Sequence, residues 1–165
     1  MNKLQFTNRL VQWLNDYLIK HYSAEYNIEV IVLDSNISKL ANEKIKLIDG
    51  YTSFDFHTDI IGLLEHKITK KIETVLLNRT VSAISLREIG EINCFSKVMK
   101  PKEAFIASLK GLPEEVNLIL LNDKMEDKLL KIDNNLSIIV FKWNAQNDMI
   151  EDRTVFPINK RQTIL

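Results

Sequence analysis

The chain has 165 residues, with 22 basic and 22 acidic side chains, so its formal net charge is zero. Hydrophobic residues make up 45% and charged residues 27%, which excludes a disordered chain and is typical of a globular one. The zero net charge gives nucleic-acid binding no support, so that function would need a local basic surface. No apolar run reaches the roughly 18 residues of a membrane span, so no membrane partner is expected.

The length fits one domain over residues 1–165, without internal repeats or Ser/Gly linkers. No apolar stretch follows the charged N-terminus, so no secretory signal is visible. The single cysteine, Cys94, excludes an internal disulfide framework and fits a reducing compartment. We therefore expect a cytoplasmic protein.

Residue patterns in the first half of the chain predict two helices and three strands. Apolar residues at helical spacing indicate an amphipathic helix, β-branched runs indicate strands, and the polar turn at 66–71 indicates an antiparallel pair. The expected elements are a helix over 6–21, a strand over 26–33, a weaker helix over 35–48, a strand over 54–64 and a strand over 72–81.

The second half begins with a capping box, in which Ser85 caps a helix and Glu88 reaches back to its first amides. Pro101 forbids continuation of that helix. This order predicts an α/β fold with a mixed sheet, helices on its faces and a right-handed parallel crossover into the strand after Pro101. The elements expected after Pro101 are a strand over 104–109, a helix with Pro113 in its first turn and a strand over 136–143.

Asp55, His57 and Asp59 are the most chemically promising side chains in the first half. If residues 54–59 are extended, all three share one strand face, where two carboxylates and an imidazole could bind a divalent metal. A solvated edge strand is the competing interpretation. Asp59 differs from the others because the chain turns apolar directly after it. Its carboxylate therefore lies at the border of the core and needs a partner or a metal.

Asn78, Arg79 and Thr80 end the next buried strand, just before a turn and a helix. Polar groups in this position often form ligand sites in open sheets, although a strand end that reaches solvent has the same pattern. Alternation places the Arg79 side chain on the opposite strand face from its two neighbours. The sequence has no Gly-rich nucleotide-binding motif, and its three histidines are too scattered for zinc.

Basic residues gather in the turn between the two antiparallel strands and around the end of the helix that Ser85 begins. Lysines there could hold phosphates, and solvated surface charge is the competing interpretation. The residues are Lys67, Lys70 and Lys71 in the turn, and Lys97, Lys100 and Lys102 around the helix end.

The order helix, three strands, helix, strand, with Asp59 in the second strand, resembles the PD-(D/E)xK nuclease superfamily, also called restriction-endonuclease-like. The resemblance covers roughly residues 2–109 and is most specific from Val75 to Thr80 and from Ala83 to Glu91. It implies an αβββαβ core over about 2–109, followed by a C-terminal helix and strand extension over about 110–165.

The resemblance implies a Mg²⁺-dependent phosphodiesterase site, in which two carboxylates hold the metal and a lysine steadies the attacking water. Carried over by position, Asp59 matches the first acid and metal ligand, Asn78 the second acid and Thr80 the lysine. Asn78 and Thr80 depart from the pattern, because an amide is a poorer Mg²⁺ ligand than a carboxylate and threonine supplies no cation. Glu91 in the following helix, together with Arg79, is the candidate to replace them.

Three functions stay open, of which the first two follow from this resemblance. The favoured one is a nuclease-fold protein with a weakened or lost catalytic centre and no cofactor. It would bind a partner protein or nucleic acid, DNA rather than RNA, in DNA processing or defence. The second is an active Mg²⁺-dependent endonuclease with a rearranged site built from Asp59, Glu91 and His57. The third is a non-enzymatic protein-interaction module. Similar nucleases imply a homodimer, and the expected nucleic-acid contacts are Lys67, Lys70, Lys71, Arg79 and Lys97.

Overall fold

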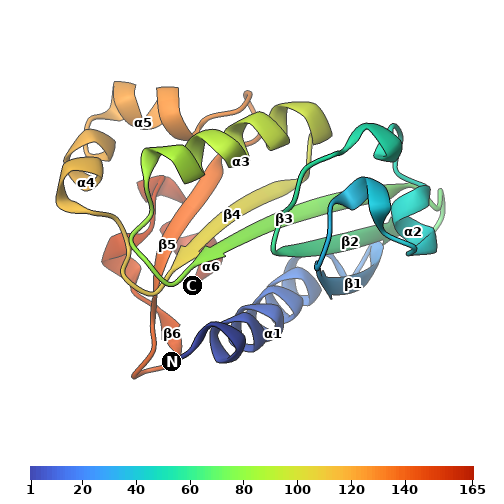
Figure 1. Cartoon of the computed structure of the whole chain (residues 1–165), viewed down its shortest axis with the longest axis horizontal. Coiled ribbons are helices and arrows are strands. Elements are labelled where there is room, and N and C mark those ends of the chain that lie inside the picture. The colour runs from blue at the N-terminus through green and yellow to red at the C-terminus, as the bar shows by residue number, and fades with distance from the viewer.

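The computed structural model describes all residues, 1–165, as a six-stranded sheet with helices on both faces (Figure 1). The chain forms α1 (Lys3–Tyr22), β1 (Tyr26–Val32), α2 (Glu43–Lys46), β2 (Ile60–His66), β3 (Ile72–Thr80), α3 (Leu86–Met99), β4 (Glu103–Ser108), α4 (Glu114–Leu120), α5 (Asp123–Leu130), β5 (Ile138–Asn144), β6 (Met149–Ile150) and α6 (Arg161–Ile164). The predicted α/β class with a mixed sheet is confirmed. None of the helices combines the length and the apolar character needed to cross a membrane.

The strands lie side by side in chain order, from β1 to β6. β1, β2 and β3 are antiparallel to one another in turn, β3, β4 and β5 are parallel, and β6 returns antiparallel to β5. Because β3, β4 and β5 run the same way, they finish at one end of the sheet, which we call the carboxyl end. The opposite end, where the turn at 67–71 joins β2 to β3, is called the hairpin end.

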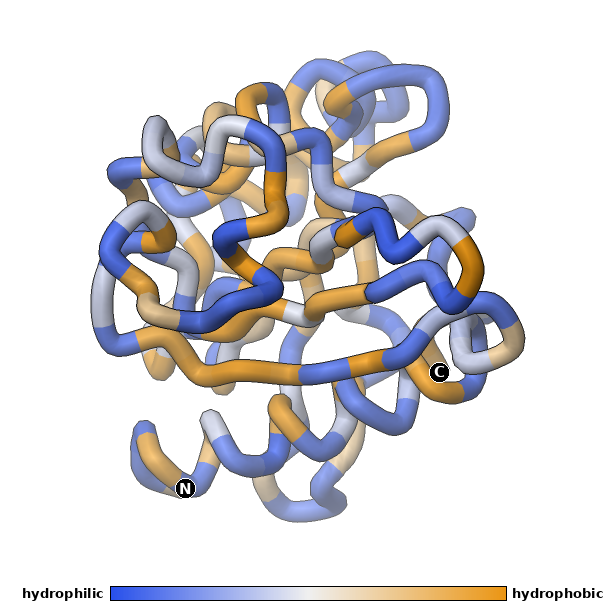
Figure 2. Tube along the Cα trace, turned by 90° about the vertical axis from the view of Figure 1, so that its right-hand side faces the viewer, coloured by the Kyte–Doolittle hydropathy of each residue, from blue (hydrophilic) through white to orange (hydrophobic).

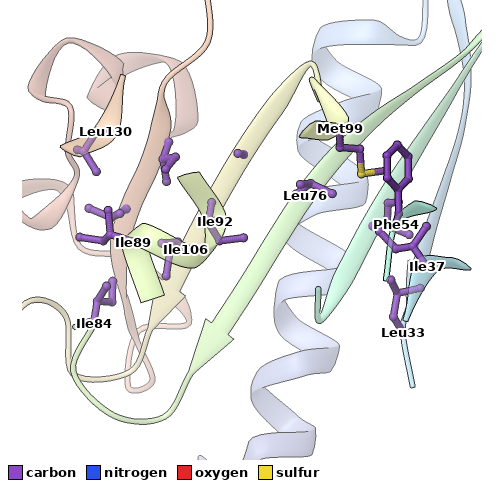
Figure 3. Close-up of a cluster of buried hydrophobic side chains, with 14 of the residues drawn as sticks. Leu33, Ile37, Phe54, Leu76, Ile84, Ile89, Ile92, Met99, Ile106 and Leu130 are labelled. Atoms are coloured by element: carbon purple, nitrogen blue, oxygen red, sulfur yellow. The ribbon is translucent and has the colours of Figure 1, made fainter. Parts of the chain in front are cut away.

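Two hydrophobic cores lie on the two faces of the sheet. α3, α4 and α5 cover one face and α1 covers the other (Figure 1). Strand alternation divides the side chains between them, so that Leu76 and Ile106 face α3 whereas Leu77 and Phe105 face α1. Apolar and polar segments alternate along the N-terminal helix in Figure 2, as the amphipathic pattern predicts. Figure 3 shows part of the core on the α3 face.

α1 approaches the sheet closely because Gly62 in β2 has no side chain. A Cβ atom at this position would lie 2.7 Å from Leu18 Cδ1 and 3.2 Å from Val75 Cβ. Leu18 is fully buried. A larger residue at 62 would therefore push α1 away from the sheet and open the core beneath it.

The predicted start and end of α3 are confirmed. The Ser85 hydroxyl accepts from the Glu88 amide, and the Glu88 carboxylate accepts from the Ser85 amide at 2.7 Å. Lys100 closes the helix in the left-handed region, directly before Pro101. The predicted parallel pairing of β3 with β4 is also observed. α3 therefore runs from the carboxyl end back to the hairpin end.

The predicted strand over 54–64 is wrong in its first part, because β2 begins only at Ile60. Residues 54–58 have no regular structure. Two of their carbonyl groups bond outside the sheet. The Phe56 carbonyl accepts from the Ile37 amide, and the Phe54 carbonyl accepts from the Ser38 amide. The segment is thus held by a neighbouring 3₁₀ turn instead of by a partner strand.

The weaker helix predicted over 35–48 is also wrong as one element. It divides into a 3₁₀ turn, Ile37–Lys39, and the single turn of α2. The Asn42 side chain accepts from the amides of Lys44 and Ile45 and so starts α2 afresh. A capping residue in the middle of a weakly periodic stretch ends one helical segment and begins another.

Residues after 109 add β5 and β6 to the same sheet. The predicted helix at 113 and strand at 136–143 correspond to α4 and β5. α5, β6 and α6 are not predicted by the sequence pattern. They are short, and two of them lie in the polar tail of the chain, where periodicity is too brief to read.

Candidate functional site at the carboxyl end of the sheet

The carboxyl end places Asp59 next to Asn78, the two positions that the resemblance equates with the metal-binding acids. Asp59 lies in a bend just before β2, and its carbonyl accepts from the Leu33 amide at 2.9 Å. This bond ties the bend to the end of β1. On the neighbouring strand, the side-chain oxygen of Asn78 accepts from the Asp59 amide at 3.3 Å.

The Asp59 carboxylate is neutralised by Arg79. Its Oδ2 accepts from the Arg79 backbone amide at 2.8 Å, and its Oδ1 lies 3.6 Å from Arg79 Nη2. The Asp59 side chain is 20% exposed and the Arg79 side chain 10%. Because water screens this pair poorly, its attraction exceeds that of an ordinary surface ion pair.

Arg79 belongs by alternation to the row of Val75 and Leu77, which packs against α1. Its guanidinium nevertheless reaches Asp59, because Asp59 lies in a bend and not in the flat part of the strand. Arg79 Nε is buried and has no hydrogen-bond partner. A buried donor without a partner costs folding free energy. The guanidinium therefore has a hydrogen-bond donor that the fold does not use.

Asn78 and Thr80 are both used within the fold. The fully buried Thr58 donates its hydroxyl to Asn78 Oδ1 at 2.7 Å, in addition to the donation from the Asp59 amide. An amide oxygen has two lone pairs, so these two donors leave none for a metal. The Thr80 hydroxyl accepts from the Ser82 amide at 3.2 Å in the following turn.

The other candidate ligands are directed elsewhere. Glu91 pairs with Arg87 at 2.9 Å on the exposed surface of α3. Asp55 accepts from the Asn36 side chain at 2.7 Å, and His57 is exposed without a hydrogen bond. No group of three or more His, Cys, Asp or Glu side chains is arranged to hold a metal ion. The trio that the sequence places on one strand face therefore does not assemble.

These contacts decide whether the carboxyl end fits Mg²⁺. Mg²⁺ in proteins is held by one or two carboxylates with water completing an octahedron. The one carboxylate here is neutralised by Arg79, the adjacent amide oxygen is doubly occupied, and Thr80 stands where the resemblance expects a lysine. The residues present do not fit the metal.

Most of the predicted nucleic-acid contacts lie away from this site. Lys67, Lys70 and Lys71 occupy the turn at the hairpin end, and Lys97 lies near the end of α3, which points the same way (Figure 1). β3 separates the two ends by roughly 26 Å, from eight steps of about 3.3 Å. Only Arg79 lies at the carboxyl end.

Two of the turn lysines already have partners. Lys67 Nζ donates to the carbonyl oxygen of Ser23 at 2.6 Å, which caps the C-terminal end of α1. Lys70 Nζ lies 3.4 Å from Glu65. Lys71 forms neither an ion pair nor a side-chain hydrogen bond, so its ammonium group has no partner in the fold.

Three cations that the sequence does not single out lie at the carboxyl end. Lys110, Lys142 and Arg153 line a polar cavity of about 300 Å³. Thr80 in β3 pairs in register with Ser108 in β4, which in turn pairs with Lys142 in β5. The cavity therefore lies along the same end of the sheet as Asp59. The signal for it in the sequence is a lysine inside the apolar strand 136–143.

The turn after β4, which forms one side of this cavity, is fixed by hydrogen bonds of its own. The buried Ser108 hydroxyl accepts from the amides of Lys110 and Gly111, each at 2.9 Å. Gly111 has φ +75°, and a Cβ there would lie 3.3 Å from Lys142 Cβ. Glycine is required for this backbone and for the close passage of the Lys142 stem. Lys142 Nζ pairs with Glu151 at 2.8 Å, whereas Lys110 and Arg153 have no acidic partner.

Comparison of the chain with family models and with curated proteins gives no match. The fold and the contacts of these residues therefore carry what can be said of function.

Proposed function

We propose that this protein is a PD-(D/E)xK nuclease-fold protein that has lost its catalytic centre and binds nucleic acid, DNA in preference to RNA. The order of elements supports the fold, because a helix and three antiparallel strands precede a helix and a parallel strand. α1 and α3 cover opposite faces of the sheet, as in a helix-flanked mixed sheet of this kind.

The observation that carries the proposal is the ion pair between Asp59 and Arg79. The guanidinium stands where a divalent cation would otherwise neutralise the acid. It supplies charge balance without an open coordination position, so it cannot polarise a phosphate or activate water as a metal does. A carboxylate that is balanced in this way stabilises the sheet end instead of catalysing hydrolysis.

The binding part of the proposal rests on the cations next to this pair. Lys110 and Arg153 have no acidic partner and line the polar cavity at the same end of the sheet. Cations of this kind neutralise backbone phosphates and release condensed counterions. They give the local basic surface that a chain of zero net charge needs.

The first experiment measures cleavage and binding together. Plasmid and single-stranded DNA are incubated with Mg²⁺ and with Mn²⁺, beside an Asp59→Ala variant, and we expect no cutting. Cutting that disappears in Asp59→Ala would contradict the loss of catalysis and favour the rearranged nuclease with Glu91 and His57.

Binding is followed by fluorescence anisotropy of a labelled duplex and of matched RNA over a range of salt. We expect Lys110→Gln and Arg153→Gln each to reduce the slope of log K against log salt by about 0.9. Lys128→Gln, an exposed lysine of α5, is the control and should leave the slope unchanged. Absence of binding to either nucleic acid would reject the proposal and leave a protein-interaction module.

A further inference from the structure

A second, larger cavity lies at the hairpin end, separate from the site above. It has a volume of about 700 Å³, within the 300–1,000 Å³ range of small-molecule sites. Its walls come from the chain after α2, the turn and start of β3, and the end of α3. Segments distant in the sequence therefore meet around it.

Three lysines line this cavity: Lys70 and Lys71 from the turn, and Lys100 from the end of α3. Members of the two basic groups that are separate in the sequence thus line one cavity. Lys71 and Lys100 have no ion pair, and Lys70 shares its charge with Glu65 at 3.4 Å. The unpaired lysines give the cavity an excess of positive charge over its acids.

The two acids that line the cavity do not cancel this charge. Glu73 accepts from the Tyr26 hydroxyl at 2.6 Å and pairs with Lys102 Nζ at 3.0 Å, so its charge is already balanced outside the cavity. Asp49 is the remaining carboxylate, set against Lys71 and Lys100. The net charge from unpaired groups is therefore positive.

Two of the lysines hold a backbone conformation that favours glycine. Lys70 has φ 60° and Lys100 has φ 49°. Glycine would adopt either with less strain, yet a cationic side chain is present at both positions. Strained residues of this kind gather at functional sites more often than elsewhere.

The rest of the lining is apolar. Phe54, Ile72 and Met99 are at most 8% exposed and line the cavity from three segments. Figure 3 shows the Met99 side chain beside the Phe54 ring where α3 ends. A ligand here would place an apolar or aromatic part against this wall and an anionic part at the lysines.

We propose that this cavity binds a free organic phosphate of about mononucleotide size. The phosphate lies at Lys71 and Lys100, because ammonium groups without a carboxylate partner bind phosphate oxygens strongly. The ring or apolar body lies against Phe54 and Met99. This site is independent of the nucleic-acid site proposed at the carboxyl end.

The test is isothermal titration calorimetry of the full chain with AMP, adenosine and inorganic phosphate. We expect AMP to bind at least tenfold more tightly than either fragment, because only AMP offers both the phosphate and the ring. Absence of AMP binding overturns the proposal. Inorganic phosphate that binds as tightly as AMP also overturns it, since the apolar wall would then contribute nothing.

Two pairs of variants locate the site. Lys100→Gln should weaken AMP binding at least tenfold, whereas Lys128→Gln on α5 should not. Leu47→Glu adds a carboxylate at the rim, where Leu47 is 66% exposed, and should weaken AMP binding similarly. Leu118→Glu is its control, on the exposed surface of α4. Equal effects from the test and control variants would show nonspecific attraction and overturn the assignment.

Discussion

The Asp59–Arg79 pair at one end of the sheet and the cavity lysines at the other end use charged side chains in opposite ways. At the carboxyl end, Asp59 and Arg79 balance each other within the fold. At the hairpin end, Lys71 and Lys100 line a cavity and form no ion pair. A charged side chain at a strand end thus shows function only when its partners are known. One that is paired inside the fold contributes stability, whereas one that is unpaired beside a cavity can bind a ligand.

The variant with the largest expected effect tests the Asp59–Arg79 ion pair at the carboxyl end. Arg79→Met should lower the free energy of unfolding by about 2 kcal/mol, because it leaves the Asp59 carboxylate poorly solvated without its cation. Urea denaturation measures it. In the double variant with Asp59→Asn, the loss should be smaller than the sum of the single losses. Strict additivity would mean that the two residues do not interact. Lys71→Gln, at the other end, should change stability by less than about 0.5 kcal/mol.

The next effect tests whether Glu73 is a structural residue of the hairpin end. Burial alone would raise its pKa, but hydrogen bonds from Tyr26 and Lys102 outweigh burial, so the pKa lies below the ordinary value of 4.5. A lowered pKa stabilises the fold above that value, and the stabilisation disappears as the pH falls through the folded-state pKa. Glu73→Gln should therefore cost roughly 1 kcal/mol at pH 7.

The free energy of unfolding of Glu73→Gln should differ less from that of the natural chain at acidic pH. Thermal or urea unfolding between pH 7 and pH 3 measures the difference, which should shrink below about pH 4.5. A difference that stays constant over this range would show that the carboxylate charge does not stabilise the hairpin end. Tyr26→Phe, which removes one of the donors to Glu73, is a useful companion variant.

The variant with the smallest expected effect separates the backbone strain at Lys100 from the role of its side chain in ligand binding. Lys100→Gly should raise the free energy of unfolding by about 0.5–1 kcal/mol, because glycine closes a helix in the left-handed region with less strain. The same change should weaken AMP binding as Lys100→Gln does. A loss of stability in Lys100→Gly would indicate that the Lys100 side chain stabilises the fold. The cavity lysines would then resemble the Asp59–Arg79 pair instead of differing from it.

Much of the fold could be predicted from local patterns. The capping box at Ser85 and the helix stop before Pro101 fix α3, and β-branched runs fix β1 and β3. The segment 54–58 could not be predicted, because its alternation is that of a strand while its carbonyls bond to a distant 3₁₀ turn. Alternation shows which side chains face inward, not which backbone partner a segment finds.

The sites were harder to predict for the same reason. The adjacency of Asp59 and Asn78 follows from strand order, which the sequence gives. The reach of Arg79 across a strand end does not, because it depends on a bend. The cavity near Lys142 depends on the register of three parallel strands, and no short sequence pattern encodes that register.

The length of β3 has a thermodynamic consequence. Sites that lie at opposite ends of a strand roughly 26 Å long, from eight steps of about 3.3 Å, and that share no side chains have no contact through which to couple directly. A ligand at one end would then leave the affinity at the other unchanged, since coupling free energy requires a change that both sites feel. Cooperativity would have to pass through the elements that span both ends, which are α3 and the long strands of the sheet. Without a second conformation of these elements, the molecule would respond to two ligands as two separate proteins would.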